Sequence, residues 1–214
     1  MRPPPFLNDP TRILVVDASA VISITASARA HQIVSAIPNR LIVPDVVVSE
    51  LESGSHKGRS NAELLRDLIK DGQLNVVTMG DVAVGYFEDL VIGPARDTLD
   101  DGEAATIACA LEIGGVPLID ERKARRICDE RHPGLAYGYT VDIFAHPNVG
   151  KALGDADLAQ AVLNALTEAR MRVLPQHLDW VVNLVGPENA ANCNSLPRSA
   201  RLQAKVAKSG GENS

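Results

Sequence analysis

The sequence predicts an α/β fold: a three-layer α/β/α sandwich with a central parallel sheet, followed by additional C-terminal helices. Short apolar runs alternate with amphipathic helical segments as far as about residue 145, which is typical of right-handed β-α-β units. Hydrophobic residues make up 45% of the 214 residues but aromatic residues only 3%. The core must therefore consist of Val, Ile, Leu and Ala, the usual filling of a buried parallel sheet.

Four short apolar runs predict the strands of this sheet. They cover residues 12–16, 40–43, 75–78 and 116–119, and residues 137–141 are expected to add a fifth strand at the edge. The segments between them predict helices over residues 18–28, 44–53, 61–70, 82–91 and 122–127. A further helix begins near Glu103 and ends at Gly114-Gly115, because glycine adopts the left-handed conformation at little cost.

Beyond residue 150 the pattern changes to helices without strands. One amphipathic helix is expected over residues 155–171, and another starts at Pro175 and stops at Gly186-Pro187. We expect both to pack on the core or on a second copy of the chain, and we expect the chain to form a homo-oligomer. The polar remainder is expected to be disordered in the free protein. The expected organisation is a domain over residues 10–150, a helical extension over 151–186 and a disordered tail over 187–214.

Composition narrows the classes of function. The net charge of −6 argues against a protein held to nucleic acid by bulk positive charge, although a local basic rim is compatible with it. The three cysteines form no C-x-x-C pair, which predicts a reducing, cytoplasmic location and no structural zinc. No run approaches the roughly 20 apolar residues of a membrane span. The proline-broken N-terminus is not that of a signal peptide, so none is expected.

Acidic residues recur at corresponding points of the predicted β-α units. Asp17 follows the first strand, Glu50 lies in the helix after the second, and Asp120 follows the fourth. Glu103 opens the helix that precedes the fourth strand. Singly, such residues have an ordinary structural interpretation, because short acids cap helices and acids near a helix start complement the helix dipole. Together they form a less ordinary pattern, because three of the four are expected at carboxyl ends of strands or at helix starts that face one edge of the sheet, where ligands bind.

Four segments in order carry a resemblance to a known family. They are VVDASAVISI, VPDVVVSELE, LDDGEAATIACALEIG and PLIDERKARRI. In these segments the chain resembles the PIN-domain nucleases, in the branch whose third motif is G-E-A and whose last motif has the form I-D-[DE]-R. The toxin ribonucleases of VapBC-type toxin–antitoxin pairs are relatives of this branch. The resemblance covers residues 13–142, and the C-terminal helices are similar to an extension found in that branch.

The resemblance implies a metal-dependent endoribonuclease that hydrolyses RNA phosphodiester bonds, and a small antitoxin protein as a partner if the chain is a toxin. It implies four catalytic, metal-binding residues: Asp17, Glu50, Glu103 and Asp120. The last motif leaves open whether Asp120 or Glu121 is the ligand. Accessory roles at the site are expected for Ser19, Asp101 and Glu121.

The chemistry of these side chains agrees with that implication. Carboxylate oxygens select hard cations, so Mg²⁺ or Mn²⁺ is favoured over zinc, and several carboxylates repel one another unless a cation offsets their charge. Basic residues near the motifs are expected to bind RNA phosphates, namely Lys57, Arg122 and Arg125. Lys57 belongs to a polar segment, residues 54–60, which is either a solvated loop or a rim that contacts the phosphate backbone.

Two phosphate-chemistry alternatives fit less well. A haloacid-dehalogenase-type phosphatase needs a second Asp two residues after the first, where this chain has Ser19. A response-regulator receiver needs adjacent acids before the first strand ends and a later strand-end Lys, neither of which the sequence shows. A third alternative stays open: a non-catalytic PIN-like module that binds nucleic acid or protein.

Overall fold

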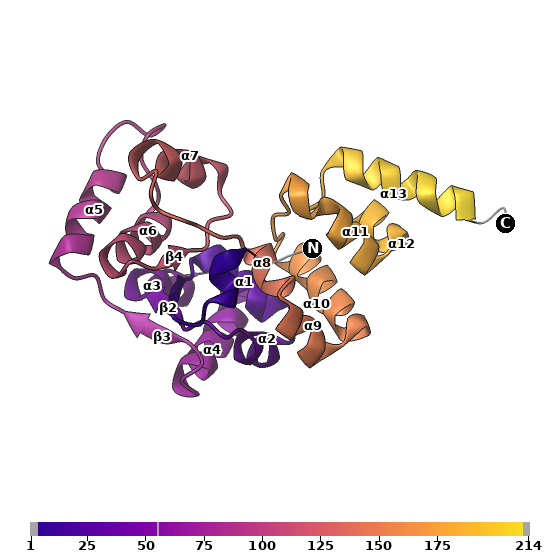
Figure 1. The fold of residues 1–214 in the computed structure, drawn as a ribbon, viewed down its shortest axis with the longest axis horizontal. Helices are drawn as coiled ribbons and strands as arrows, with labels where there is room; N and C mark the ends of the chain where they lie inside the picture. The colour runs from indigo at the N-terminus through magenta and orange to yellow at the C-terminus, as the bar shows by residue number, and fades with distance from the viewer. Residues whose placement is uncertain (1–3, 55, 212–214) are drawn as a thin grey trace.

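The computed structural model describes residues 4–54 and 56–211 of the chain and is built around a parallel sheet (Figure 1). Its strands are β1 (Leu14–Val15), β2 (Leu41–Pro44), β3 (Asn75–Val77) and β4 (Val116–Pro117). They lie in the order β3-β2-β1-β4, and all three neighbouring pairs are parallel. The four strands expected from the apolar runs are confirmed, although β1, β3 and β4 are shorter than their runs and β2 is shifted by one residue.

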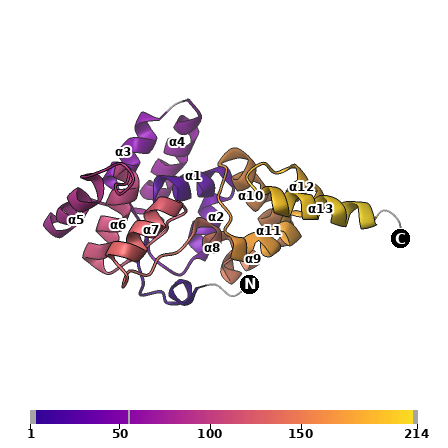
Figure 2. The ribbon, with the colours of Figure 1, turned by 90° about the horizontal axis from the view of Figure 1, so that it is seen from above.

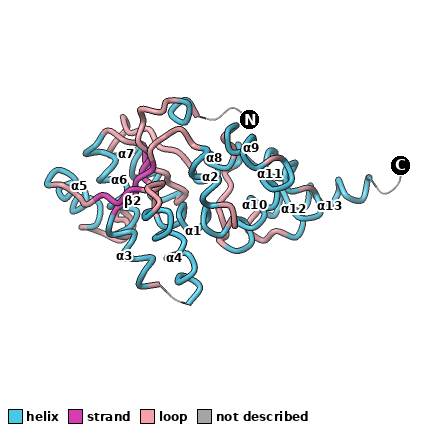
Figure 3. The backbone as a smooth tube through the Cα atoms, turned by 90° about the horizontal axis from the view of Figure 1, so that it is seen from below, coloured by secondary structure: helices cyan, strands magenta, loops and turns pink. Residues whose placement is uncertain are grey.

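Alternate residues of the strands face two different layers of helices. Leu14 and Val16 belong to a hydrophobic cluster that includes the first layer, whereas Val15 and Ile42 pack with Cys109 on the opposite face. The first layer contains α1 (Ala18–Ala26), α2 (Ala30–Ala36) and α4 (His56–Lys70). The second contains α5 (Asp81–Val91), α6 (Asp101–Ile113) and α7 (Arg122–Arg131). The strands lie between these helices in Figure 3, so the predicted three-layer sandwich is confirmed.

The helix α3 (Asp45–Ser53) follows β2 and contacts both α4 and α6. The polar segment after it differs from the loop expected over residues 54–60, because α4 already begins at His56. Lys57 therefore belongs to a helix, and its side chain lies outside the described residues. The helix starts five residues earlier than the apolar pattern indicated, because residues 56–60 contain no apolar side chain that would mark it.

The expected fifth strand over residues 137–141 is wrong. Only one parallel bridge forms there, between Leu118 and Gly138, and the chain then turns into α8 (Thr140–Phe144). Polar contacts explain the turn. The N–H of Tyr139 donates to Asp142 Oδ2 at 3.0 Å, and the N–H of Thr140 donates to Asp120 Oδ1 at 3.0 Å. These two backbone N–H groups are therefore engaged at the start of α8 and are not available for hydrogen bonds to β4.

A helical extension packs against the first layer (Figure 2). It comprises α9 (Pro147–Leu153), α10 (Asp155–Glu168), a 3-10 turn η2 (Pro175–His177) and α11 (Leu178–Val185). A short 3-10 turn, η1 (Pro5–Asn8), precedes the sheet. Helix α10 lies on α1, and α11 lies on α10. None of the helices in the described ranges is long and apolar enough to cross a membrane.

The described part of the tail forms α12 (Pro187–Asn192) and α13 (Arg198–Gly211), which pack on each other. The disorder expected over residues 187–214 of the free protein stays a prediction. The buried face of this pair is made largely of small side chains, including Ala190, Cys193, Ala200 and Ala204. Helices are recognised in a sequence mainly by large aliphatic residues at helical spacing. A buried face of small side chains lacks that signal, so the composition suggested disorder.

Candidate functional site

Asp17 lies at the carboxyl end of β1 and also caps α1. Its Oδ1 accepts the N–H of Ala20 at 2.7 Å, and the Ser19 hydroxyl donates to the carboxylate at 2.8–2.9 Å. Only 8% of Asp17 is exposed. The helix-cap interpretation is therefore correct for this residue, and it is compatible with a role in a site, because the cap fixes the carboxylate at the edge of the sheet.

Asp120 and Glu121 both follow β4, but their side chains lie in different environments. Asp120 is buried, and its Oδ1 accepts the Thr140 N–H at 3.0 Å. Glu121 caps α7 and is half-exposed, with Oε1 2.6 Å from a guanidinium nitrogen of Arg172. Among the described residues, Asp120 thus has no salt-bridge partner. Glu121 is already paired.

Helix α6 brings further acids to the same place. Asp100 caps it by accepting the N–H of Glu103 at 2.8 Å, and this turn orients Glu103. Glu50 approaches the turn from α3. A Cβ added to Gly102 would lie 2.5 Å from Glu50 Oε2, so glycine is the residue that leaves room for the Glu50 carboxylate. Asp101 lies beside this point, in an adjacent groove that it shares with Glu50.

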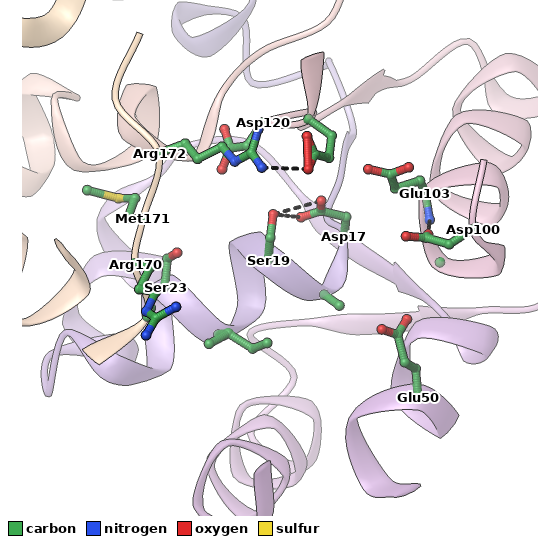
Figure 4. Close-up of a pocket in the computed structure, with 15 residues that line it drawn as sticks. Asp17, Ser19, Ser23, Glu50, Asp100, Glu103, Asp120, Arg170, Met171 and Arg172 are labelled. Atoms are coloured by element: carbon green, nitrogen blue, oxygen red, sulfur yellow. Dashed lines mark hydrogen bonds and ion pairs between the residues drawn. The ribbon is translucent and has the colours of Figure 1, made fainter. Parts of the chain in front are cut away.

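These side chains surround a cavity of about 330 Å³. Figure 4 shows Asp17, Glu103, Asp120 and Glu50 directed toward it from four different elements. The full lining consists of Asp17, Ala18, Ser19, Ile22, Ser23, Glu50, Asp100, Gly102, Glu103, Asp120, Glu121, Ala169, Arg170, Met171 and Arg172. All four acids singled out in the sequence lie in it, together with Ser19 and Glu121. Asp100, Arg170 and Arg172 were not singled out.

The cavity is strongly unfavourable for negative charge. Burial, and next the charge of Asp120, raises the pKa of Asp17 to about 7. Burial, and next Asp100, raises the pKa of Glu103 to about 7. Burial is also the main cause that raises the pKa of Asp120 and of Glu50. In the part of the chain that the structure describes, no salt bridge reaches any of these four carboxylates.

The donors fit a hard divalent cation in chemistry and in charge. All are oxygens, and they carry negative charge that the described part of the protein does not neutralise, which is what Mg²⁺ and Mn²⁺ sites offer. The fit does not extend to a preformed coordination shell. Within residues 4–54 and 56–211, no three His, Cys, Asp or Glu side chains already converge as metal ligands.

Two of the basic residues proposed from the sequence, Arg122 and Arg125, lie apart from the cavity lining, and the side chain of the third, Lys57, lies outside the described residues. Arg122 is exposed at the first position of α7. The guanidinium of Arg125 donates to the Asp120 carbonyl at 3.1 Å and lies over the Tyr139 ring, 5.5 Å from its centroid. Arg126 is paired with Glu130 and Asp97 on the outer surface of the helix. Arg125 therefore supports the end of β4, whereas Arg122 and Arg126 are exposed.

The arginines that do line the cavity come from the extension. Arg170 and Arg172 follow α10 and flank Met171. The sequence gives one weak signal for them: two arginines separated by a single apolar residue, directly after an amphipathic helix. That pattern indicates a segment in which Met171 is buried and the two arginines stay on the surface. It does not indicate that this surface is the wall of the cavity.

A family model described as a PIN domain matches residues 13–187, which is most of the chain and includes the sheet, all the acids of the cavity and the extension as far as α11. No curated protein matches the chain.

Proposed function

The chain belongs to the PIN-domain family, and from that premise we propose that it is a metal-dependent endoribonuclease. Membership of the family indicates a nuclease-type or nucleic-acid-binding function. The proposal is the narrower one: hydrolysis of RNA phosphodiester bonds in the acidic cavity, with Mg²⁺ or Mn²⁺ as the cofactor.

One observation carries the proposal. Four carboxylates from four separate elements line one cavity at the carboxyl edge of the sheet, and none has a salt-bridge partner among the described residues. Burying unpaired acids together destabilises a protein. Local destabilisation of this kind is typical of functional sites. A divalent cation is the ligand that would relieve it here.

Each residue has a role in this proposal. Asp17, Glu50, Glu103 and Asp120 would hold the cation, which, when bound, activates the attacking water and offsets charge on the phosphate and the leaving oxygen. The Ser19 hydroxyl and the Ala20 N–H keep the Asp17 carboxylate in one orientation. The Thr140 N–H does the same for Asp120.

The remaining sequence-derived residues keep secondary roles. Asp120 is favoured over Glu121 as a ligand, because Glu121 is engaged with Arg172. Asp101 borders the groove beside Glu50 and is an accessory acid. Arg122 is exposed at the start of α7 and would contact RNA outside the cavity, whereas Arg125 positions the β4 end.

A direct assay tests the proposal. The purified chain is incubated with single-stranded, structured and circular RNAs, with Mg²⁺, with Mn²⁺ or with chelator. We expect cleavage with metal, including opening of the circles, which requires internal cutting. Asp17→Asn and Glu103→Gln should abolish it. Cleavage that persists in chelator would contradict the mechanism.

One observation favours a second candidate function, a non-catalytic PIN-like module that binds nucleic acid or protein. The described residues contain no preformed group of three metal ligands. Such a module would bind RNA equally with and without metal, and would leave every substrate intact. Binding measured beside the cleavage assay separates the two functions.

The resemblance to toxin ribonucleases leads to a finer proposal, that the chain is the toxin of a toxin–antitoxin pair and acts in the cytoplasm on cellular RNA. Its support is the motif set alone. A small DNA-binding protein encoded by the neighbouring reading frame, and relief of growth arrest when the two are expressed together, would be the expected results. Expression of the catalytically intact chain without any effect on growth would contradict it.

A further inference from the structure

The charge of the cavity wall is divided between two parts of the fold. Six acidic residues line it, all from the sheet edge and its helices, whereas the two basic residues of the lining, Arg170 and Arg172, come from the segment after α10. Neither arginine was expected at the site from the sequence. An RNA strand is a polyanion, so an acidic cavity repels it unless positive groups hold the flanking phosphates.

The segment that carries these arginines is anchored to the core. Met171 is buried, and its N–H donates to the Ala165 carbonyl of α10 at 3.0 Å. Arg170 adopts a left-handed backbone conformation with φ of 55°, which ends the helix and turns the chain toward the cavity. The arginines on either side of Met171 are thus presented at the cavity wall by packing, as Figure 4 shows.

The partner of Arg172 is exchangeable. Its guanidinium lies 2.6 Å from Glu121 Oε1, but the two side chains are 54% and 43% exposed. Ion pairs so open to solvent contribute little to stability. A guanidinium also binds a phosphate group through two parallel hydrogen bonds. A phosphate that entered the cavity would therefore displace Glu121 from Arg172 at little cost in free energy.

We infer that Arg170 and Arg172 form the RNA-binding wall of the cavity, where they hold backbone phosphates of the substrate and Arg172 exchanges Glu121 for one of them. The inference rests on the proposed ribonuclease function, because it identifies the residues that bind its substrate. It moves the main phosphate contact from Lys57, Arg122 and Arg125 to the extension, so the extension becomes part of the substrate site.

Binding measurements test the inference independently of cleavage. Anisotropy of a labelled single-stranded RNA is followed in chelator for the parent chain, Arg170→Ala, Arg172→Ala and the double variant. Each single variant should bind roughly tenfold more weakly, the loss expected for one charge-assisted contact. The slope of log affinity against log salt should fall by about 0.7 for each lost phosphate contact. The variants Arg170→Lys and Arg172→Lys should retain part of the affinity, because lysine keeps the positive charge but not the paired hydrogen bonds of the guanidinium.

Arg126→Ala is the matched control. It removes the same charge from α7, where Arg126 is paired with Glu130 and Asp97 away from the cavity. It should leave RNA affinity within about twofold of the parent, well below the roughly tenfold loss of one charge-assisted contact. In the cleavage assay with Mn²⁺, Arg170→Ala and Arg172→Ala should raise KM more than they lower kcat, because the arginines contact the phosphates before the chemical step.

A double-mutant cycle tests the exchange of partners. Glu121→Gln releases Arg172, so it should tighten RNA binding in the parent background and have a smaller effect in the Arg172→Ala background. An equal gain in both backgrounds would show that Glu121 acts only by general repulsion, and would overturn the exchange.

The outcomes separate the inference from the function on which it rests. If the parent binds and cleaves RNA and the arginine variants do so equally well, the inference is overturned and the ribonuclease function stands. If the arginine variants lose binding and the parent cleaves nothing in either metal, the inference is supported and the catalytic proposal fails. A parent chain that binds no RNA overturns both.

Discussion

Asp120 stands beside Asp17 at the carboxyl edge of neighbouring strands, and its charge is, after burial, the largest cause that raises the pKa of Asp17 to about 7. The two carboxylates are held there by different N–H donors, Ala20 for one and Thr140 for the other. Each N–H donor holds its carboxylate in place, although the negative charge of the other carboxylate makes that place unfavourable for an ionised group. The folded chain therefore keeps two like charges together through local hydrogen bonds.

The first prediction concerns pH. The pKa of Asp17 is about 7 in the folded chain, against an ordinary value of 3.8, so folding favours its protonated form. This stabilisation is complete below about pH 4 and is lost as the pH rises through 7, at about 1.4 kcal/mol per unit of pKa difference. Denaturant melts of the metal-free chain between pH 5 and pH 8 should show the loss.

Asp17→Asn should flatten that dependence, since asparagine still caps α1 but carries no charge. Because the substitution also removes repulsion, the metal-free variant should be as stable as the parent at pH 8, or more stable. A parent and a variant with parallel stability curves would show that Asp17 is not destabilised by ionisation in the folded chain.

The second prediction concerns metal. If Asp17 and Glu103 share a cation, Mn²⁺ at ten times its dissociation constant should stabilise the parent by about 1.4 kcal/mol. Asp17→Asn and Glu103→Gln should each lose most of that gain. Asp157, which pairs with Arg29 on the outer face of α10, supplies the control Asp157→Asn. Equal thermal shifts with Mn²⁺ in all four proteins would refute a shared site.

The positions of the four strands and their parallel direction could be predicted from the sequence, because the signals for them are local. Apolar runs mark the strands, and the acids that follow them mark their carboxyl ends. The turn at residues 139–142 could not be predicted, because it depends on Asp120, which lies 20 residues away from the N–H that it accepts. The helices of the tail were missed because alanine and cysteine form their buried face.

The same distinction applies to the site. The acids of the β-α units were predictable, since parallel topology brings strand ends together whatever the loops do. The position of Arg172 was not, because it depends on how α10 packs on α1. The choice between Asp120 and Glu121 likewise depends on Thr140 and Arg172, which are distant in sequence.

The third prediction concerns the buried pair that joins the extension to α8. His177 Nε2 lies 2.9 Å from Asp142 Oδ1, and both side chains are almost fully buried. Removing one partner leaves the other buried without it, so Asp142→Ala should destabilise the chain by about 2–3 kcal/mol. Asp179→Ala, on the exposed side of α11, is the control. Urea melts with a similar midpoint for both variants would contradict the role of the pair.

The fourth prediction concerns the tail. Leu196 and Ala204 are 2% exposed in the structure, so amides of α12 and of the first turns of α13 should exchange slowly in the free chain. Their protection should be lost together when Ala204→Asp places a charge in the interface. Rapid exchange throughout residues 188–206 of the parent would instead support the disorder expected from composition.

The last prediction separates folding from chemistry at Gly102. Alanine there would place its Cβ 2.5 Å from Glu50 Oε2, and the atom that must move is the end of a flexible side chain. The backbone can therefore stay, and alanine stabilises a helix relative to glycine by roughly 0.5–1 kcal/mol. Gly102→Ala should keep or raise the melting temperature while it displaces the Glu50 carboxylate from the cavity.

Gly85→Ala provides the control, because Gly85 lies within α5 and a Cβ added there meets nothing within 4 Å. Both variants should gain similar stability from the helix, but only Gly102→Ala should lose RNA cleavage and the stabilisation by Mn²⁺. Its loss should resemble that of Glu50→Gln, since both remove the same oxygen from the site. If Gly102→Ala cleaves RNA as well as Gly85→Ala does, the position of Glu50 does not matter to the reaction, and Glu50 is not a ligand.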